Sequence, residues 1–419
     1  MSGRQLLSTR DLIAQGKLII NDGYRAKNIE LGSNGIPFIR VGNLLNDGFQ
    51  FEDADRFPVE NLSRVGIKIS QPGDVVLTTK GTVGRFAFIR EDTQRFVYSP
   101  QISFWRVIDK QTLEPRFLYY WMQGREFQIQ CSQVKGQTDM ADYVSLLEQR
   151  QMQITLPPLP TQRRIAEILG RLDDKIEVNR RINRTLEAMA QALFQHHFVE
   201  FGPYQAELVE SEAGLIPRGW EVTPLGAHIK VAKGLSYKGQ WLAREGMPLH
   251  NLNSIYEGGG YKYEGIKFYV GEYQERHTVK PGDLIVANTE QGFDYLLIGC
   301  PAIVPKRFGE MGLFTHHIYK VELLPDSPLT THYMYFWVKN PQLRQAVTAF
   351  TNGTTVNMLS RDGLQIPLMV IPPSEIVQSF DRVASNVTRQ IEHNEDENRK
   401  LAEIRDYLLP RLLSGEIEA

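Results

Sequence analysis

Two long stretches of the chain carry apolar residues at alternating spacings of three and four, the pattern of one helix face. They cover residues 161–199 and 374–409, and each follows a Pro-Pro pair. The apolar rhythm is interrupted at the same place in both, by Asn179 and by Asn394. Such a seam is typical of a coiled coil, in which a core asparagine fixes register at some cost in stability. We predict that the two helices pair antiparallel, with Asn179 and Asn394 near the middle of the seam.

Each stretch has an alternative interpretation, an amphipathic helix that packs on its own globular domain. A helix of roughly 35 residues is about 50 Å long, which exceeds the width of an average domain, so pairing is favoured. Charge favours pairing as well, since arginines surround Asn179 and carboxylates surround Asn394. The apolar positions of the expected seam are Ile165, Ile168, Leu172, Ile182, Leu186, Met189 and Leu193 in the first helix, and Phe380, Val383, Val387, Leu401, Ile404 and Leu408 in the second.

The two helices belong to a longer internal repeat. The Pro-Pro pair at 157–158 recurs at 372–373, an offset of 215 that also carries Asn179 onto Asn394. Upstream matches keep the same order with small changes of offset: 35–37 with 246–248, 72–76 with 281–285, and 136–138 with 353–355. We predict four parts: a globular domain over residues 1–155, a helix over 156–200, a second globular domain over 201–367, and a C-terminal helix over 368–419.

Both globular domains have the pattern of mixed α/β structure. Strand-like runs such as 74–78 and 283–287 are bounded by glycine-rich turns, and helices are expected at 115–129 and 331–347. The predicted class is α+β. It consists of two similar mixed α/β domains separated by two long helices that form an antiparallel coiled coil, with a pseudo-twofold internal repeat.

Composition adds limits to this picture. The net charge of −2 argues against indiscriminate nucleic-acid binding, which needs a large positive excess, but leaves room for local contacts. The only two cysteines, Cys131 and Cys300, lie far apart in the sequence, so a disulfide framework is not expected. No run approaches the roughly 18 to 20 apolar residues of a membrane span, and the first residues lack the apolar core of a signal peptide. We expect a cytoplasmic protein without a membrane partner.

Motifs of known chemistry are missing from the sequence. There is no G-x-x-x-x-G-K-[ST] phosphate loop, and neither Pro-Pro pair belongs to an Asp/Asn-Pro-Pro-Tyr/Phe segment of the amino-methyltransferase kind. The nine histidines show no metal-ligand spacing, and Asp74 and Asp283, which follow Pro-Gly, are interpreted as turn residues. We expect no catalytic residue and no metal site, and therefore a chain that is not an enzyme on its own.

The boundaries of the repeat resemble those of a known family. Residues 154–162 read ITLPPLPTQ and are followed by Ile-Ala, Ile-Leu and Asp-Asp-Lys-Ile within 165–176. This pattern resembles the specificity subunit of a Type I restriction–modification system, over nearly the whole chain. Residues 216–220, IPRGW, resemble the usual start of that family's target-recognition domains. The first domain lacks this start, and Ser-Glu-Ile at 374–376 replaces the commoner Leu-x-x-Gln.

The resemblance implies a mechanism. Each globular domain is expected to read one half of a bipartite, asymmetric site in double-stranded DNA, while the paired helices set the gap. The helices are also expected to dock two methyltransferase subunits, and restriction subunits complete the complex. S-adenosylmethionine, ATP and magnesium would be bound by these partners, so no cofactor is expected on this chain. The alternative is a coiled-coil scaffold whose two globular domains bind protein partners.

Two polar, glycine-containing loops in each domain are the expected DNA contacts. The loop after the Pro-Gly-Asp strand differs between the copies, TKGT at 79–82 against NTEQG at 288–292, while the flanking strands match. Lysine suits guanine, Asn or Gln suits adenine, and Glu suits cytosine. The turns at 136–138 and 353–355 offer hydroxyl and N–H groups to phosphates. The predicted DNA-contacting residues are Thr79, Lys80, Thr82, Arg85, Lys135, Gln137 and Thr138 in the first domain, and Asn288, Thr289, Glu290, Gln291, Thr354 and Thr355 in the second. For each of them an ordinary solvated turn is the alternative.

Large apolar residues near the helix ends are the expected docking patches for methyltransferase subunits. Packing against the chain's own globular domains is the alternative. The residues are Phe194, Phe198 and Phe201 near the end of the first helix, and Leu409, Leu412 and Leu413 near the end of the second.

Overall fold

The computed structural model describes residues 3–45, 48–79, 84–134, 144–291, 294–353 and 356–419. The chain forms two compact units. Unit 1 comprises Met1–Glu177 and Arg399–Ala419, and unit 2 comprises Val178–Asn398. The finer division into four parts stays a prediction. Within the described ranges, no helix combines the length and the apolar character that a membrane crossing requires.

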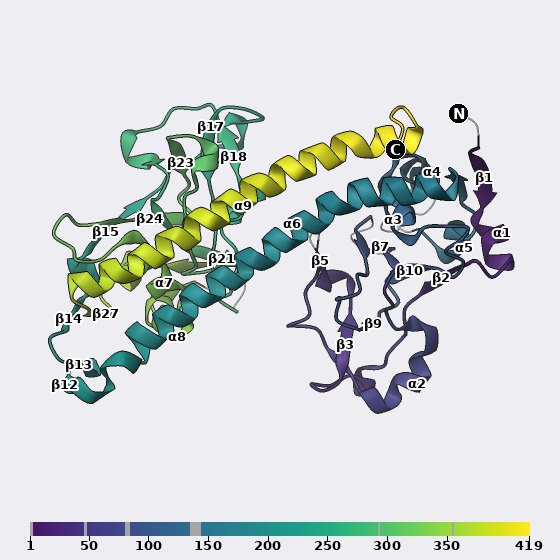
Figure 1. Cartoon of the computed structure of the whole chain (residues 1–419). Helices are drawn as coiled ribbons and strands as arrows, with labels where there is room; N and C mark the ends of the chain where they lie inside the picture. The colour runs from purple at the N-terminus through teal and green to yellow at the C-terminus, as the bar shows by residue number, and fades with distance from the viewer. Residues whose placement is uncertain (1–2, 46–47, 80–83, 135–143, 292–293, 354–355) are drawn as a thin grey trace. The chain divides into compact units, whose positions relative to one another are not determined.

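Unit 1 is built around an antiparallel sheet with strand order β2-β10-β7-β8 (Figure 1). The central strands are buried at every position because both faces of the sheet are covered. Side chains alternate between the faces: Val75 packs in the cluster of helix α3, and Val76 packs with Ile39 on the other side. The strands are β1 (Gln5–Ser8), β2 (Leu18–Asp22), β3 (Ile36–Ile39), β4 (Leu44–Leu45), β5 (Gly48–Phe49), β6 (Arg56–Phe57), β7 (Val75–Thr78), β8 (Phe86–Phe88), β9 (Val97–Tyr98), β10 (Ile102–Val107) and β11 (Gln153–Leu156). The short helices are α1 (Thr9–Ala14), α2 (Leu62–Val65), α3 (Pro115–Gln123), α4 (Arg125–Val134) and α5 (Leu146–Gln149).

Unit 2 repeats this plan with strand order β15-β24-β20-β22, and its second sheet, β16-β18-β17-β23-β19, is an extended form of the three-stranded sheet β6-β3-β9 of unit 1. Helix α7 covers the first sheet as α3 does in unit 1. The strands are β12 (Leu208–Ser211), β13 (Gly214–Pro217), β14 (Glu221–Pro224), β15 (Ile229–Lys233), β16 (Leu242–Ala243), β17 (Met247–His250), β18 (Lys267–Tyr269), β19 (Thr278–Val279), β20 (Leu284–Ala287), β21 (Thr289–Gln291), β22 (Pro301–Ile303), β23 (Gly312–Phe314), β24 (Ile318–Leu323), β25 (Thr351–Asn352), β26 (Val356–Leu359) and β27 (Leu368–Ile371). The short helices are α7 (Thr331–Lys339) and α8 (Pro341–Thr348).

A close approach of two backbones is preserved in both units. A Cβ added to Gly23 would collide with the carbonyl oxygen of Ser99, and one added to Gly234 would collide with that of Thr315. Only glycine permits this approach. These positions correspond through the strand registers, so the two units share their backbone framework in detail. The predicted α+β class and the internal repeat are confirmed.

The two long helices are α6 (Leu159–Phe194) and α9 (Ser374–Ser414), and each passes from one unit into the other. In unit 1, Arg405 Nη1 lies 2.8 Å from Asp173 Oδ1. In unit 2, Asn183 is bonded to Asn394. Residues further along α6 therefore contact residues that come earlier in α9. The two helices run in opposite directions, so they pair antiparallel, as predicted.

Two details of the helices differ from the prediction. Ile182, Met189, Val383 and Ile404 were expected in the seam but are between 41% and 64% exposed. The asparagines themselves occupy the seam, which places Ile182 and Met189 on a neighbouring face. Helix α9 also continues past Pro410 to Ser414, because Leu412 on the last turn is buried in the core of unit 1.

Candidate nucleic-acid interface and its attachment to the helix pair

Four buried asparagines join α6 to α9 within unit 2. Asn179 Nδ2 donates to Oδ1 of Asn398 at 2.9 Å, and Asn394 Nδ2 donates to Oδ1 of Asn183 at 2.7 Å. None is more than 8% exposed. A shift by one turn would leave two of the four buried amides without an asparagine partner, which is costly. Asn179 and Asn394 thus lie in the seam but bond to different partners, and their role in fixing register stays a prediction.

The sequence prediction missed Asn183 and Asn398 as seam residues. The signal was present, because each helix carries two asparagines four residues apart, and this spacing places them on one face. Asn179 also donates to Glu397 at 2.7 Å, and Asn183 donates to Glu395 at 2.8 Å. The polar part of the seam therefore extends over slightly more than one helical turn.

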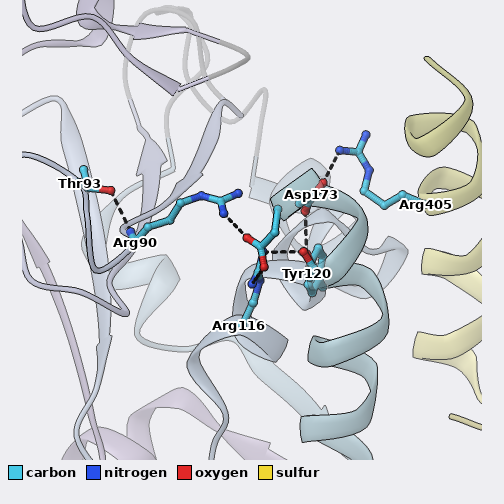
Figure 2. A network of polar contacts seen from close by, with 8 residues as sticks. Arg90, Thr93, Arg116, Tyr120, Asp173 and Arg405 are labelled. Carbon is cyan, nitrogen blue, oxygen red and sulfur yellow. Dashed lines mark hydrogen bonds and ion pairs between the residues drawn. The ribbon is translucent and has the colours of Figure 1, made fainter. Parts of the chain in front are cut away.

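In unit 1, two consecutive carboxylates of α6 hold the globular part against the helices (Figure 2). Arg116, on α3, makes two bonds of 2.8 Å with Asp174, and Arg90, beyond β8, also pairs with Asp174. The Tyr120 hydroxyl donates to Asp173 at 2.6 Å. Since Arg405 of α9 binds the other oxygen of Asp173, four side chains from three segments converge on one turn of α6. We call this set the aspartate clamp.

The aspartate clamp changes the acidity of its members. Burial alone would raise the pKa of the Asp174 carboxyl, but the guanidinium groups of Arg116 and Arg90 outweigh it, so the pKa lies below its ordinary value. Burial, followed by the charge of Asp173, raises the pKa of Tyr120. Asp174 is therefore ionised and Tyr120 is a neutral donor at neutral pH. A bidentate arginine–carboxylate pair of this kind fixes direction as well as distance.

Gly170 in the middle of α6 is explained by the aspartate clamp. A glycine inside a helix costs about 1 kcal/mol relative to alanine. A Cβ at Gly170 would lie 2.7 Å from Cζ of Arg116, and Arg116 Nη2 donates to the Gly170 carbonyl oxygen at 3.0 Å. The glycine makes room for the guanidinium group. The isolated glycine was visible in the sequence, whereas its partner, 54 residues away, was not.

Unit 2 is attached to its helical segments by different residues. His332 is the second residue of α7, as Arg116 is of α3, and its Nδ1 lies 2.9 Å from Asp381 Oδ1 on α9. Tyr335 and Lys339 both bind Glu187 of α6, at 2.7 and 2.8 Å. The same helix of the repeat therefore carries the attachment in both units, with different chemistry.

The apolar residues proposed as docking patches are largely buried. Phe194 is 0% and Phe198 is 6% exposed, and both pack in the core of unit 2 with Tyr333 and Phe380. Leu412 is likewise buried in the core of unit 1. For these residues the alternative, packing on the chain's own globular part, describes the structure. The remaining three are partly buried against the same cores: Phe201, Leu409 and Leu413.

The predicted DNA-contacting residues are described only in part. Seven of them lie outside the described residues: Lys80, Thr82, Lys135, Gln137, Thr138, Thr354 and Thr355. Gln291 ends β21, and only its backbone is described. In unit 1, Thr79 is 5% exposed and donates to the Gln101 carbonyl oxygen, while Arg85 donates to that of Leu44.

In unit 2, three of the predicted residues hold their own segment. Asn288 is fully buried and donates to the His316 carbonyl oxygen at 3.1 Å, and Thr289 donates to Asn288 Oδ1 at 2.7 Å. The Glu290 carboxylate accepts from three successive backbone N–H groups, those of Leu296–Ile298. A base contact would require these bonds to open, and DNA binding by these residues stays a prediction.

The two predicted loops of each unit nevertheless meet at their described ends. In unit 1, Val144 N donates to the Thr79 carbonyl oxygen at 3.4 Å, and in unit 2, Leu359 N donates to that of Asn288 at 2.8 Å. Strands β21 and β26 continue this contact in unit 2, where Thr289 pairs with Met358. Described segments that are more than 60 residues apart in the sequence thus meet at the same place in both copies.

The fold and this repeated loop site define a class: a protein with two matched globular units mounted on paired helices. Residues 17–188 match the family described as Type I restriction modification DNA specificity domain. Over 91% of its length the chain is similar to the Type I restriction enzyme HindI specificity subunit of Haemophilus influenzae, with 25% identity and 94% of that protein covered.

A second relative shows the same similarity, and a solved structure shows the same fold. The MjaIX specificity subunit of Methanocaldococcus jannaschii is 24% identical over 93% of this chain and 88% of that protein. The type I restriction-modification system S subunit from M. genitalium has the same fold, with a TM-score of 0.57, 12% identity and coverage of 98% of this chain and 96% of that one. The predicted resemblance to Type I specificity subunits is confirmed.

Proposed function

We propose that this chain is the non-catalytic, sequence-specific DNA-recognition subunit of a Type I restriction–modification complex and reads a bipartite, asymmetric site. One observation carries the proposal: in both units the described ends of two loops are hydrogen-bonded at equivalent positions, yet the loop sequences differ. The strand registers equate Thr78 with Ala287, so Thr79 corresponds to Asn288; the residues that follow them in the sequence are Lys80 and Thr289. A shared frame with different side chains is what two readers of different half-sites require.

The helix pair supports the bipartite part of the proposal. The buried asparagine pairs favour a single register of the two helices, which a helical spacer between two readers requires. The aspartate clamp and the Glu187 and Asp381 contacts then hold each reader in one orientation on its helices. We infer that the number of base pairs between the half-sites is set by this helical frame.

The exposed face of the helices is the proposed docking surface for two methyltransferase subunits. Met189 of α6 is 64% exposed and Ile404 of α9 is 48% exposed. The repeat offset of 215 makes them equivalent, so each unit presents one large apolar residue at the same position of its helix. Two equivalent positions suit two copies of one partner. Restriction subunits would join the same complex.

Selection of binding sites from random DNA tests the recognition proposal. The full chain, co-expressed with its methyltransferase subunit, is incubated with a pool of randomised duplexes, and the bound DNA is sequenced. We expect two short conserved blocks separated by a gap of constant length, about one helical turn from centre to centre. A single block, or no enrichment, contradicts the proposal. Failure to enrich DNA while other proteins bind the globular units would favour the scaffold alternative.

Co-purification tests the docking surface. M189D and I404D place a charge at the equivalent exposed positions and are expected to weaken retention of the methyltransferase, with the double variant losing it. A188D is the matched control, since Ala188 is exposed on the same helix but points about 100° away. Equal retention by M189D/I404D and A188D would contradict docking at this surface.

A further inference from the structure

Four basic residues converge in unit 2 beside the predicted reading loop. They are Lys233 at the end of β15, Lys267 at the start of β18, and His316 and His317 between β23 and β24. The two imidazole rings lie 3.8 Å apart, and His317 Nδ1 lies 3.2 Å from Oγ1 of Thr289. We call these four residues the basic cluster.

The basic cluster lacks neutralising charge. Lys267 Nζ donates to the Tyr237 hydroxyl at 3.2 Å, and among the described residues no carboxylate lies within ion-pair distance of either lysine. Burial lowers the pKa of His317, and His316, Lys267 and Lys233 lower it further. All three neighbours lower the pKa of His317, as positive charges do. The site therefore disfavours a further proton unless an anion is bound there.

Unit 1 carries the opposite charge at the positions that correspond to the two lysines. Ser103 and Tyr319 occupy equivalent positions of β10 and β24. Asp22 pairs with Ser103, and Lys233 pairs with Tyr319, so strand register equates Asp22 with Lys233. The same reasoning equates Asp55 with Lys267 and the segment 100–101, Pro-Gln, with the two histidines.

The carboxylates of unit 1 are moreover neutralised within the unit. Asp22 pairs with Lys68 at 2.9 Å and Asp55 pairs with Arg40 at 2.6 Å. The positions that are paired and acidic in unit 1 are therefore basic and open in unit 2. The basic cluster is not a requirement of the shared framework, since unit 1 has the same framework without it.

We propose that Lys233, Lys267, His316 and His317 form a binding site for phosphate groups of the DNA backbone, present in unit 2 alone. This rests on the proposed recognition function and adds to it a division of labour. Lysines neutralise phosphates as point charges, and phosphate contacts fix the position of a protein on DNA without reading sequence. Since His317 touches Thr289, a strand anchored at this site lies next to the loop of the second reader.

The salt dependence of DNA binding tests the site. The full chain with its methyltransferase subunit is titrated onto a duplex of the selected sequence at several salt concentrations. K233Q/K267Q is expected to lower the slope of log affinity against log salt by about 2, close to 1 for each lost phosphate contact, with unchanged base preference. The matched control is K230Q, because Lys230 is exposed on β15 but three residues earlier, on the opposite face.

Each other outcome has a definite meaning. An unchanged slope in K233Q/K267Q overturns the phosphate site, and so does a changed base preference with the slope kept. Wild-type protein that binds no bipartite DNA overturns the recognition function, and the site with it. For His317, the variant H317Q should match wild type at pH 8 and bind more weakly at pH 6, because a bound phosphate would oppose the lowering of the pKa of this imidazole. Equal binding at both pH values removes His317 from the site.

Discussion

Unit 1 and unit 2 share a backbone plan but carry different charges at equivalent positions of that plan. Unit 1 pairs its charges internally, as in the aspartate clamp and in the buried pair of Asp74 and Arg106, with two contacts of 2.7 Å. Unit 2 leaves the basic cluster open and holds all nine histidines of the chain. The two units thus share their strand order and their close glycine contacts, whereas their charged residues differ at equivalent positions. This difference is expected if each unit reads a different half-site.

The turn aspartates show this divergence within one motif. Asp74 and Asp283 each accept a backbone N–H from three residues earlier, at 2.9 Å, which confirms their interpretation as turn residues. In unit 1 the carboxylate is also bound by Arg106 and the Tyr98 hydroxyl. In unit 2 burial raises the pKa of Asp283, and Glu322 stands where unit 1 has Arg106.

Low pH should destabilise unit 2 more than unit 1, and we expect this difference in stability to be the largest of the predicted effects. Burial lowers the pKa of His250 to about 3. The unfolded chain binds the proton near pH 6.5, so this contribution to stability is present above pH 6.5 and is lost as pH falls toward 3. Its full size is about 5 kcal/mol. Hydrogen exchange measured from pH 7 to pH 4 should show unit 2 opening first.

Unit 1 provides the internal reference for this experiment. It has no histidine, and the lowered pKa of Asp174 contributes stability that is lost only as pH falls below about 4. Earlier opening of unit 1 would contradict the comparison. The variant H250Q should flatten the pH dependence of unit 2, whatever its effect on stability at pH 7.

Loss of the buried ion pair between Asp74 and Arg106 should have the second largest effect on stability. D74N leaves Arg106 buried with no ionised partner, since the two side chains are 0% and 8% exposed. We expect a loss of about 3 to 5 kcal/mol in unit 1, measured by urea denaturation. D283N at the equivalent turn should cost less than about 1 kcal/mol, since it removes only a turn contact. Equal losses in the two variants would show that the units handle this charge alike.

Filling the helix glycine should have a smaller effect. G170A improves helix propensity by about 1 kcal/mol but displaces Arg116 from Asp174, a charge-assisted bond pair worth about 1.5 to 3 kcal/mol. A net loss of about 1 to 2 kcal/mol in unit 1 is expected. S385A, at the equivalent position of α9, meets no such partner and should be neutral or stabilising. A stabilising G170A would show that the aspartate clamp contributes little.

The sequence predicted what depends on period and repetition. The helix seam, the α+β class and the antiparallel pairing all follow from apolar spacing and a constant offset. The seam positions were wrong at Ile182 and Met189, because asparagines were taken as interruptions when they form the seam. Continuation of α9 through Pro410 also escaped prediction, since it depends on the burial of Leu412 in a core built by distant residues.

Contacts between distant segments were beyond the sequence. Nothing in the local pattern links Gly170 to Arg116, or His317 to Lys233 and Lys267, because these pairs meet only when the sheets assemble. The adjacent histidines were considered only as metal ligands, and in the described ranges no cluster of three or more metal-binding side chains occurs. Strand register, which equates acids with lysines between the units, was needed to recognise the basic cluster.

Separate reading of two half-sites is the central claim, and one selection experiment tests it directly. Binding sites are selected from random DNA by the wild-type complex, by K80A in the first unit and by Q291A in the second. Each variant should relax one half-site at a cost of about 1 to 3 kcal/mol, and the two should relax opposite halves. If both variants alter the same half, or if either weakens binding evenly across all sequences, the assignment of one reader to each unit is wrong.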